Sequence, residues 1–359
     1  VVVRGRSTSV SVRLGKVEST EASESDSFAL RVFVGDRVAS VSANAGTDAT
    51  ELAQRAVAMA RVSPEDPFAG LADPKDLADG HHDLDLFDPT PVDSEALSDA
   101  ALAAEDAALA VDGVTNSGGA GASAGMGGLV LVTSDGFSGN YLGTRFSRSV
   151  SVIAGEGTAM ERDYDFDSRL FYGDLDDPAT IGRSAGNRAI RRLNPRKAET
   201  GSDVTIVLDP RVARGFVGHL AGAINGASVA RKTSFLRDMM DKPVLKSGMR
   251  LVDDPQIVRG PASKPFDGEG VRGNRLDMIN DGPSPDIAIT NRAAQFVVHN
   301  GAKLNAHLRA PGMVFDIHAY WGTSNGGTNP AAWDAGEYAG RYANHIGNVD
   351  HDARGLTAL

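Results

Sequence analysis

An α+β fold is the class that this 359-residue sequence predicts. Apolar residues alternate as in strands over the first 43 residues, and amphipathic segments with recognisable caps indicate helices. Strands followed by a helix occur twice, across 1–61 and 94–193, which indicates an internal duplication that lacks the first helix of the first copy. We expect an N-terminal α+β domain over 1–198 and a strand-rich C-terminal domain over 199–359.

The first strand-helix unit has local signals for each of its elements. Apolar residues at every second position predict strands at 7–14 and 28–43. Residues 48–61 form an amphipathic pattern, with Asp48 as the N-cap and Glu51 three residues later. We therefore expect a helix that starts at Asp48.

The second unit follows a Pro- and Asp-rich surface connection at 62–93. The Ala-rich segment 94–111 predicts a helix that starts at Asp93 or Ser94. The glycine-rich segment 117–128 lacks the Gly-Lys-Ser/Thr of a phosphate-binding loop, and we expect a flexible hairpin or lid loop there. The remaining predicted elements are strands at 127–136, 145–157 and 158–168 and a helix at 178–193.

Acidic and aromatic residues alternate at 161–168, a segment that reads ERDYDFDS. In a strand, this order puts three carboxylates on one face and two aromatic rings on the other. A polar strand face is favoured over a calcium site, because the glycine and terminal glutamate of an EF-hand loop are missing. For the basic residues that follow, we favour a solvated helix face; these are Arg188, Arg191, Arg192, Arg196 and Lys197.

The C-terminal domain should begin with a buried strand at 204–210, and Asp209-Pro210 is typical of a helix start. The following helix should end at Asn225-Gly226. Its apolar residues recur at helical spacing and predict one buried stripe, made of Val212, Phe216, Leu220 and Ala223.

His219 lies beside that stripe, where a zinc-protease helix would carry its ligands. Such a helix needs two histidines on one face and a carboxylate that activates water. Leu220 follows His219, and positions 223 and 224 are Ala and Ile, so neither the second ligand nor the general base is present. We expect a packed, hydrogen-bonded histidine and no metal site on this helix.

The amino-acid composition excludes several kinds of site and makes others unexpected. The chain has no cysteine, which excludes disulfides, Cys-ligated zinc and thiol nucleophiles. A net charge of −11 argues against a broad phosphate-binding surface, so direct nucleic-acid binding is not expected. No apolar run approaches the roughly 20 residues that span a bilayer, and we expect a cytoplasmic protein without a membrane segment.

Four segments of the sequence resemble the PmbA/TldE branch of the TldD/PmbA family. They are VRGRSTSVSVRLGKVESTEAS (3–23), ERDYDFDSR (161–169), FVGHLAGAINGASVARKTSFLRD (216–238) and LVDDPQIVRGPASKPFDGEGVRGNRLDMINDG (251–282). The resemblance covers about 1–282. Residues 283–359 depart from the family pattern, as a divergent, replaced or mis-assigned C-terminus would.

The resemblance implies a subunit of a cytoplasmic heterodimeric metalloprotease, a family also called modulators of DNA gyrase. The TldD-type subunit carries the metal helix. The PmbA/TldE-type subunit lacks the ligands and helps to enclose unfolded or modified peptides. We therefore expect no cofactor in this chain, zinc in a TldD-like partner, and no catalytic residue here.

Six residues are candidates for lining the shared substrate cavity, where they would hold peptide backbone and termini. They are His219, Asn225, Arg231, Lys232, Asp267 and Glu269. One alternative is a self-sufficient metal-dependent hydrolase that uses the histidines of the tail as ligands, namely His299, His307, His318, His345 and His351. Another is a regulatory module that binds gyrase.

Overall fold

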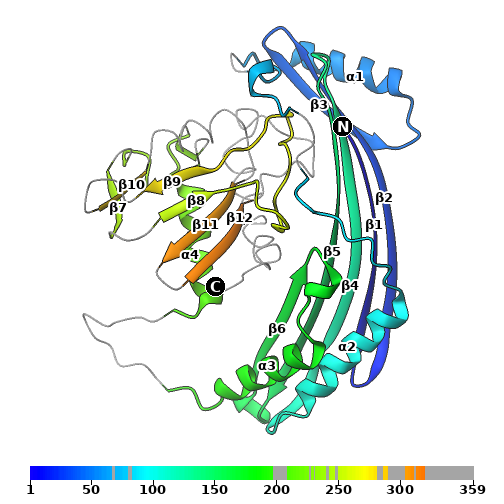
Figure 1. Cartoon of the computed structure of the whole chain (residues 1–359), viewed down its shortest axis with the longest axis vertical. Coiled ribbons are helices and arrows are strands. Elements are labelled where there is room, and N and C mark those ends of the chain that lie inside the picture. The colour runs from blue at the N-terminus through cyan, green and yellow to red at the C-terminus, as the bar shows by residue number, and fades with distance from the viewer. Residues whose placement is uncertain are drawn as a thin grey trace.

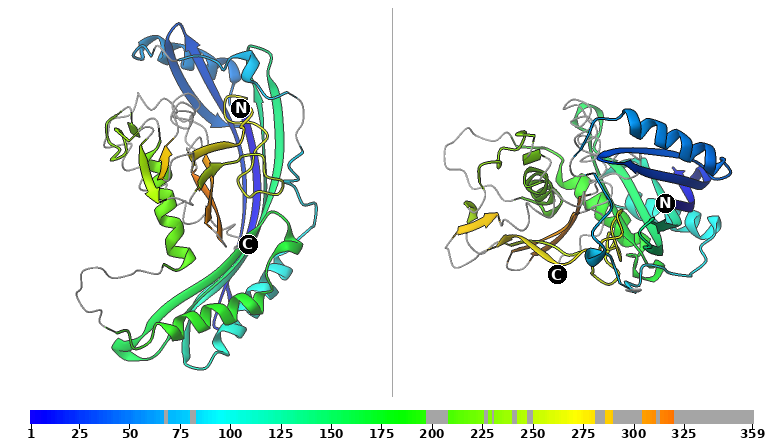
Figure 2. Two further views of the ribbon diagram at one scale, coloured as in Figure 1. Left: turned by 60° about the vertical axis from the view of Figure 1, so that its left-hand side comes forward. Right: turned by 90° about the horizontal axis from the view of Figure 1, so that it is seen from above.

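Two antiparallel sheets dominate the structure, a computed structural model (Figure 1). It describes residues 1–66, 69–79, 83–196, 208–225, 228–229, 231–239, 242–246, 250–280, 286–289, 304–310 and 313–319. The first sheet is long and curved. The described residues from 208 onward, which we call the second part of the chain, lie on the inner side of its curve (Figures 1 and 2). The α+β prediction is confirmed. The division at 198/199 stays a prediction, since 197–207 lie outside the described residues.

The first sheet has the strand order β3-β2-β1-β4-β5-β6. It consists of two three-stranded meanders that are joined along β1 and β4, which pair antiparallel from Val2↔Val130 to Val12↔Ala120. The duplication itself stays a prediction. The strands are β1 (Val2–Arg13), β2 (Lys16–Val34), β3 (Arg37–Asn44), β4 (Val114–Val132), β5 (Ser138–Ala154) and β6 (Glu161–Arg169).

The prediction of a hairpin or lid loop at 117–128 is wrong, because this segment lies inside β4 between β1 and β5. Its small residues fit a crowded position. A Cβ on Gly128 would lie 2.8 Å from the carbonyl oxygen of Tyr141 on β5. Pairing with two long neighbours overrides the weak strand propensity of glycine.

Three helices begin at the aspartates that the sequence indicates. The side chains of Asp48, Asp93 and Asp209 accept hydrogen bonds from backbone N–H groups of the first turn. Asp177 does the same for the third helix, in which Pro178 is the first residue. The helices are α1 (Ala49–Val62), α2 (Ser94–Leu109), α3 (Pro178–Arg191) and α4 (Pro210–Ala223), and short 3₁₀ turns are at Pro74–Asp76, Gly157–Ala159 and Tyr172–Asp174.

Helices α2 and α3 pack against each other and cover one end of the first sheet, while α1 covers the β2–β3 end. The contact between α2 and α3 is close because Gly182 faces Ala104 and Gly186 faces Val111. The core beneath them consists of small and branched side chains, including Val10, Val12, Leu97, Ala101, Ala104, Val150, Val152, Ile181 and Ala185.

A fully buried glutamate fixes the turn between β1 and β2. Glu105 of α2 accepts hydrogen bonds from the N–H groups of Leu14 (2.9 Å) and Gly15 (2.8 Å) and from the hydroxyl of Ser117. Leu14 and Gly15 both have positive φ, as a tight hairpin turn requires. The buried carboxylate thus compensates its desolvation with three donors.

The second sheet has the order β12-β11-β8-β9-β10-β7. Helix α4 lies beside β11 and β12. Its strands are β7 (Pro243–Lys246), β8 (Arg250–Asp253), β9 (Leu276–Asn280), β10 (Asp286–Ile289), β11 (Leu304–Ala310) and β12 (Met313–Ala319).

The predicted buried stripe of α4 is wrong for its first half. Val212 and Phe216 are 55% and 60% exposed, whereas Val217, Ala221 and Ile224 are buried. The helix is rotated relative to the prediction, so an apolar ridge faces outward beside the exposed His219. In the described part of the chain, no helix is long and apolar enough to cross a membrane.

The α2–α3 contact gives the first testable prediction. A Cβ on Gly182 would lie 2.2 Å from the Ala104 carbonyl oxygen, so the two helices must separate. Gly182→Ala should lower the free energy of unfolding by about 1–3 kcal/mol in a urea titration. The matched control is Gly215→Ala in α4, where no atom lies within 4 Å of the added Cβ. That variant should gain up to about 1 kcal/mol from helix propensity.

Candidate functional site

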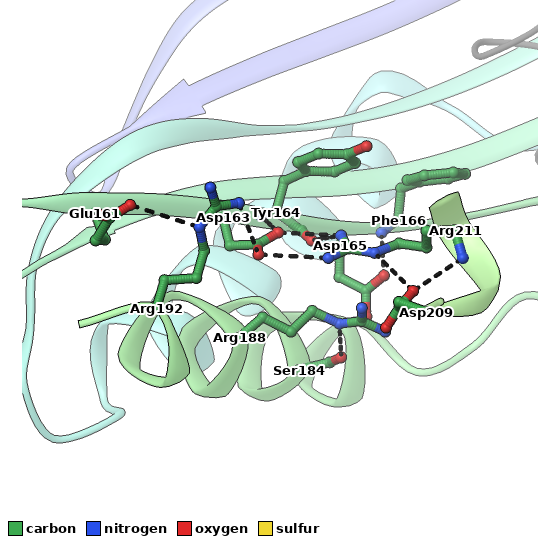
Figure 3. A network of polar contacts seen from close by, with 10 residues as sticks. All are labelled: Glu161, Asp163, Tyr164, Asp165, Phe166, Ser184, Arg188, Arg192, Asp209 and Arg211. Carbon is green, nitrogen blue, oxygen red and sulfur yellow. Dashed lines mark hydrogen bonds and ion pairs between the residues drawn. The ribbon is translucent and has the colours of Figure 1, made fainter. Parts of the chain in front are cut away.

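A network of acids and arginines joins β6, α3 and the start of α4 (Figure 3). Asp163 and Asp167 are each 5% exposed, and Asp165 lies on the same face. Tyr164 and Phe166 stack on the other face, with ring centroids 6.1 Å apart. The strand therefore has the acidic and aromatic faces that the sequence predicts.

Every aspartate of this face has an arginine partner. Asp163 binds Arg211 at 3.0 Å and Arg192 at 3.6 Å. Asp165 lies 3.6 Å from Arg188, and Asp167 lies 3.0 Å from Arg169. The polar strand face is the right interpretation. The solvated face predicted for the basic residues is confirmed for Arg191 and Arg192, which are exposed. It is wrong for Arg188, whose side chain is 31% exposed, because α3 packs against β6.

Arg211 is the residue that links the two parts of the chain here. It is the second residue of α4, and its guanidinium also donates to the Tyr164 carbonyl oxygen (3.1 Å) and lies 5.2 Å from the Tyr164 ring centroid. Burial acts to raise the pKa of Asp163. The hydrogen bonds from Arg211 and the Tyr164 N–H and the charges of Arg211 and Arg192 outweigh it and hold that pKa below its usual value.

A second connection is the segment 254–275 between β8 and β9, which we call the strap. Its Phe266 packs edge-on against Phe137 (5.2 Å between centroids) and Tyr141 (5.5 Å) of the first sheet. A Cβ on Gly139 would lie 2.7 Å from the Phe266 ring, so glycine at 139 permits this contact. The strap thus fills an aromatic pocket at the β4–β5 turn.

Charged contacts hold the strap on both sides of Phe266. Glu269 forms an ion pair with Arg31 of β2 at 2.9 Å. Arg259 binds Asp85 at 2.5 Å, and its guanidinium lies 3.8 Å from the Phe171 ring centroid. Asp76, Ala78 and Leu84, predicted as part of a surface connection, also form backbone hydrogen bonds with the strap.

Asp267 shapes the tip of the strap. Its Oδ1 accepts the N–H groups of Glu269 (2.8 Å) and Val271 (3.0 Å), while Oδ2 is buried with no hydrogen-bond partner among the described residues. Burial, with a smaller contribution from the charge of Glu269, raises the pKa of Asp267 to about 6. The carboxyl group is therefore a strap-shaping group that titrates near neutral pH.

The six candidate cavity residues fall into two groups. His219 and Lys232 are exposed, Arg231 is half-buried, and Asn225 is buried at the end of α4, where its Oδ1 accepts the Ser228 N–H at 3.3 Å. Asp267 and Glu269 belong to the strap and bind within it and to β2. That the two groups line one cavity stays a prediction.

Among the described residues, no group of three or more His, Asp or Glu side chains is placed to hold a metal ion. Of the tail histidines, His307 is a residue of β11 and His318 a residue of β12. In the strand register, His307 is opposite Asp316 and His318 is opposite Asn305. The other three lie outside the described residues. A metal site built from the tail therefore stays an open alternative.

The sequence did not indicate three residues that connect the two parts: Arg31, Asp163 as a partner of α4, and Arg211. Asp163 was recognisable only as a member of the acidic face. No local signal in the sequence identifies the distant partner of an arginine such as Arg211.

Models of one protein family match most of the chain. The PmbA/TldA metallopeptidase domain 1 matches residues 1–60, the central domain 87–193 and the C-terminal domain 200–297. Metalloprotease PmbA of Escherichia coli O157:H7 is 36% identical over 319 residues, which is 86% of this chain and 70% of that protein. A Metalloprotease PmbA homolog of Haemophilus influenzae is 33% identical over 289 residues, 79% of this chain and 63% of that protein.

Solved structures share the fold. A candidate modulator of DNA gyrase from Bacteroides thetaiotaomicron superposes with a TM-score of 0.73 at 24% identity, covering 83% of this chain and 68% of that one. TldE from Thermococcus kodakarensis gives a TM-score of 0.65 at 17% identity, covering 83% and 67%. At these identities, the superpositions establish the fold alone.

The Asp163–Arg211 contact predicts a measurable coupling. Arg211→Ala should lower the free energy of unfolding by about 2 kcal/mol, because a buried carboxylate loses its nearest cation. A double-mutant cycle with Asp163→Asn should give a coupling of about 1–2 kcal/mol. Because the folded pKa of Asp163 is lowered, this contribution is present above about pH 4 and is lost as the pH falls further.

The matched control for this cycle is the exposed pair Arg237 and Asp238, with 51% and 82% of their side chains exposed. Arg237→Ala should change the free energy of unfolding by less than about 0.5 kcal/mol. A coupling near zero for Asp163 and Arg211 would mean that they do not hold α4 to β6.

Asp267 predicts a pH-dependent stability. Its folded pKa is raised from 3.8 to about 6, so the stability that the protonated carboxyl contributes is lost as the pH rises from about 4 to 6. Between pH 4.5 and 7, Asp267→Asn should gain about 1–2 kcal/mol relative to the parent chain. Asp79→Asn, at a side chain 94% exposed, is the control and should follow the parent. Parallel pH profiles for Asp267→Asn and the parent would contradict the assignment.

Proposed function

The chain belongs to the PmbA/TldD metallopeptidase family, and from this premise we propose that it is a TldE-like subunit that works with a metal-bearing TldD-like partner. In this proposal the chain helps to enclose unfolded or modified peptides, and zinc and the catalytic groups are in the partner. The observation that carries the proposal is the composition of α4. Its only histidine is followed by Leu220, and Ala223 and Ile224 stand where a second ligand would be needed.

The environment of α4 supports this role. Ala223 and Ile224 are buried in the second part of the chain, while His219 is exposed beside Val212 and Phe216. This outward ridge is free to line a cavity shared with another subunit. Exposed apolar side chains that lie together are common where proteins bind each other.

The strap supplies the other half of the proposed cavity lining. Glu269 offers a partly exposed carboxylate that can receive the amino group or an N–H group of a peptide, and Asp267 shapes the strap backbone that carries it. Arg231 and Lys232, just after α4, offer donors for carbonyl and carboxylate groups. Such groups bind the backbone and termini of a peptide and do not select among its side chains. This suits a chamber that accepts unfolded peptides of varied sequence.

Reconstitution with the TldD-like protein of the same organism tests the proposal. We expect cleavage of an unfolded test peptide only when both chains are present, with loss on chelation and recovery on adding zinc. His219→Ala in this chain should leave the zinc content of the complex unchanged. A zinc-ligand variant of the partner is the matched control and should abolish both zinc binding and cleavage.

Two outcomes would contradict the proposal. Chelator-sensitive cleavage by the isolated chain would identify a self-sufficient hydrolase that uses its tail histidines. Stable binding to gyrase, without any contribution to proteolysis, would identify a regulatory module instead.

A further inference from the structure

Among the strands that the structure describes, β6 lies at the edge of the first sheet, with β5 as its paired neighbour. An edge strand exposes a row of unpaired N–H and C=O groups that can pair with a strand of another chain. In an antiparallel pair, alternate residues direct both groups away from the partner strand. On β6 these are the residues at even positions, and three of them, at 164, 166 and 168, follow an aspartate.

Each of these three outward N–H groups has a side-chain acceptor. Tyr164 donates to Oδ1 of Asp163 (2.8 Å), Phe166 to Oδ1 of Asp165 (3.0 Å) and Ser168 to Oδ1 of Asp167 (2.9 Å). The alternation of aspartate with other residues therefore supplies one carboxylate for each of these three outward N–H groups.

Neighbouring groups hold two of these carboxylates in place. Arg211 binds Asp163 and also donates a hydrogen bond to the outward carbonyl oxygen of Tyr164 at 3.1 Å. The second oxygen of Asp167 accepts the Asp176 N–H at 2.8 Å. Asp165 has the looser partner, Arg188 at 3.6 Å. An incoming strand would have to displace these bonds before it could pair.

The same kind of bond occurs in β4 beyond Ala120, the last residue of β4 that pairs with β1. There the Ser117 N–H donates to Oδ1 of Asn116 at 2.8 Å. A short polar side chain thus satisfies the N–H that follows it where strand pairing does not. On β6 this substitution is repeated three times along one edge.

We infer that Asp163, Asp165 and Asp167 keep β6 from pairing with β6 of a second copy of this chain. Pairing of two identical edges would form a symmetric dimer with a continuous sheet. Because the three N–H groups already donate to aspartate oxygens, they are not available as donors for this dimer. The aspartates of two copies would also approach each other along the joined edge, where like charges repel. The inference does not depend on the proposed function.

The test compares two double variants of the full chain. Asp163→Ala/Asp165→Ala removes two caps, whereas Asp163→Asn/Asp165→Asn keeps an acceptor oxygen at each position and removes the same two charges. Sedimentation velocity should show concentration-dependent dimers for the Ala variant and the parent association state for the Asn variant. At concentrations low enough to keep the Ala variant monomeric, its amide hydrogen exchange at Phe166 should be about tenfold faster or more than in the Asn variant.

Equal association states in the two variants would overturn the inference. If the double Ala variant does not fold, Asp165→Ala and Asp165→Asn replace the pair, since Asp165 has the loosest partner. Exchange at Phe166 must then be faster in Asp165→Ala than in Asp165→Asn. Equal exchange in these two variants would show that the carboxylate does not cap the edge.

Discussion

The carboxylate of Asp163 lies where three elements meet: strand β6, the end of α3 and the start of α4. Asp163 is 5% exposed. Its carboxylate forms ion pairs with Arg211 and Arg192 and accepts a hydrogen bond from the Tyr164 N–H. A charge this deeply buried is tolerated only with such donors around it. Because Arg211 is the second residue of α4, this one carboxylate positions the helix that carries His219 against a strand of the other sheet.

The strap holds the second part of the chain at another place on the first sheet. Phe266 enters the aromatic pocket next to Phe137 and Tyr141, and Glu269 pairs with Arg31. Helix α4 and the strap therefore have separate supports, one on β6 and one at β2 and the β4–β5 turn. Two supports fix the orientation of the second part of the chain more firmly than either alone.

Local signals were predictable from the sequence, and long-range ones were not. The aspartate caps of α1, α2 and α4 were readable because cap and helix are adjacent in the chain. The strand at 117–128 was missed because its stability comes from pairing with β1 and β5. The buried face of α4 was misassigned, since Val212 and Phe216 fit an inward stripe equally well until the second sheet is placed. The acidic face of β6 was predicted, but its partners Arg188 and Arg211 were not, because they come from α3 and α4.

The central claim is that this chain presents a metal-free counterpart of a catalytic helix to a metal-bearing partner. Native mass spectrometry of the chain co-purified with its TldD-like partner measures stoichiometry and metal content in one experiment. The account predicts a complex of the two chains that carries zinc, and release of this chain without metal when the complex is dissociated in the gas phase. Zinc that stays with this chain after dissociation, or a chain that never binds the partner, would contradict the account.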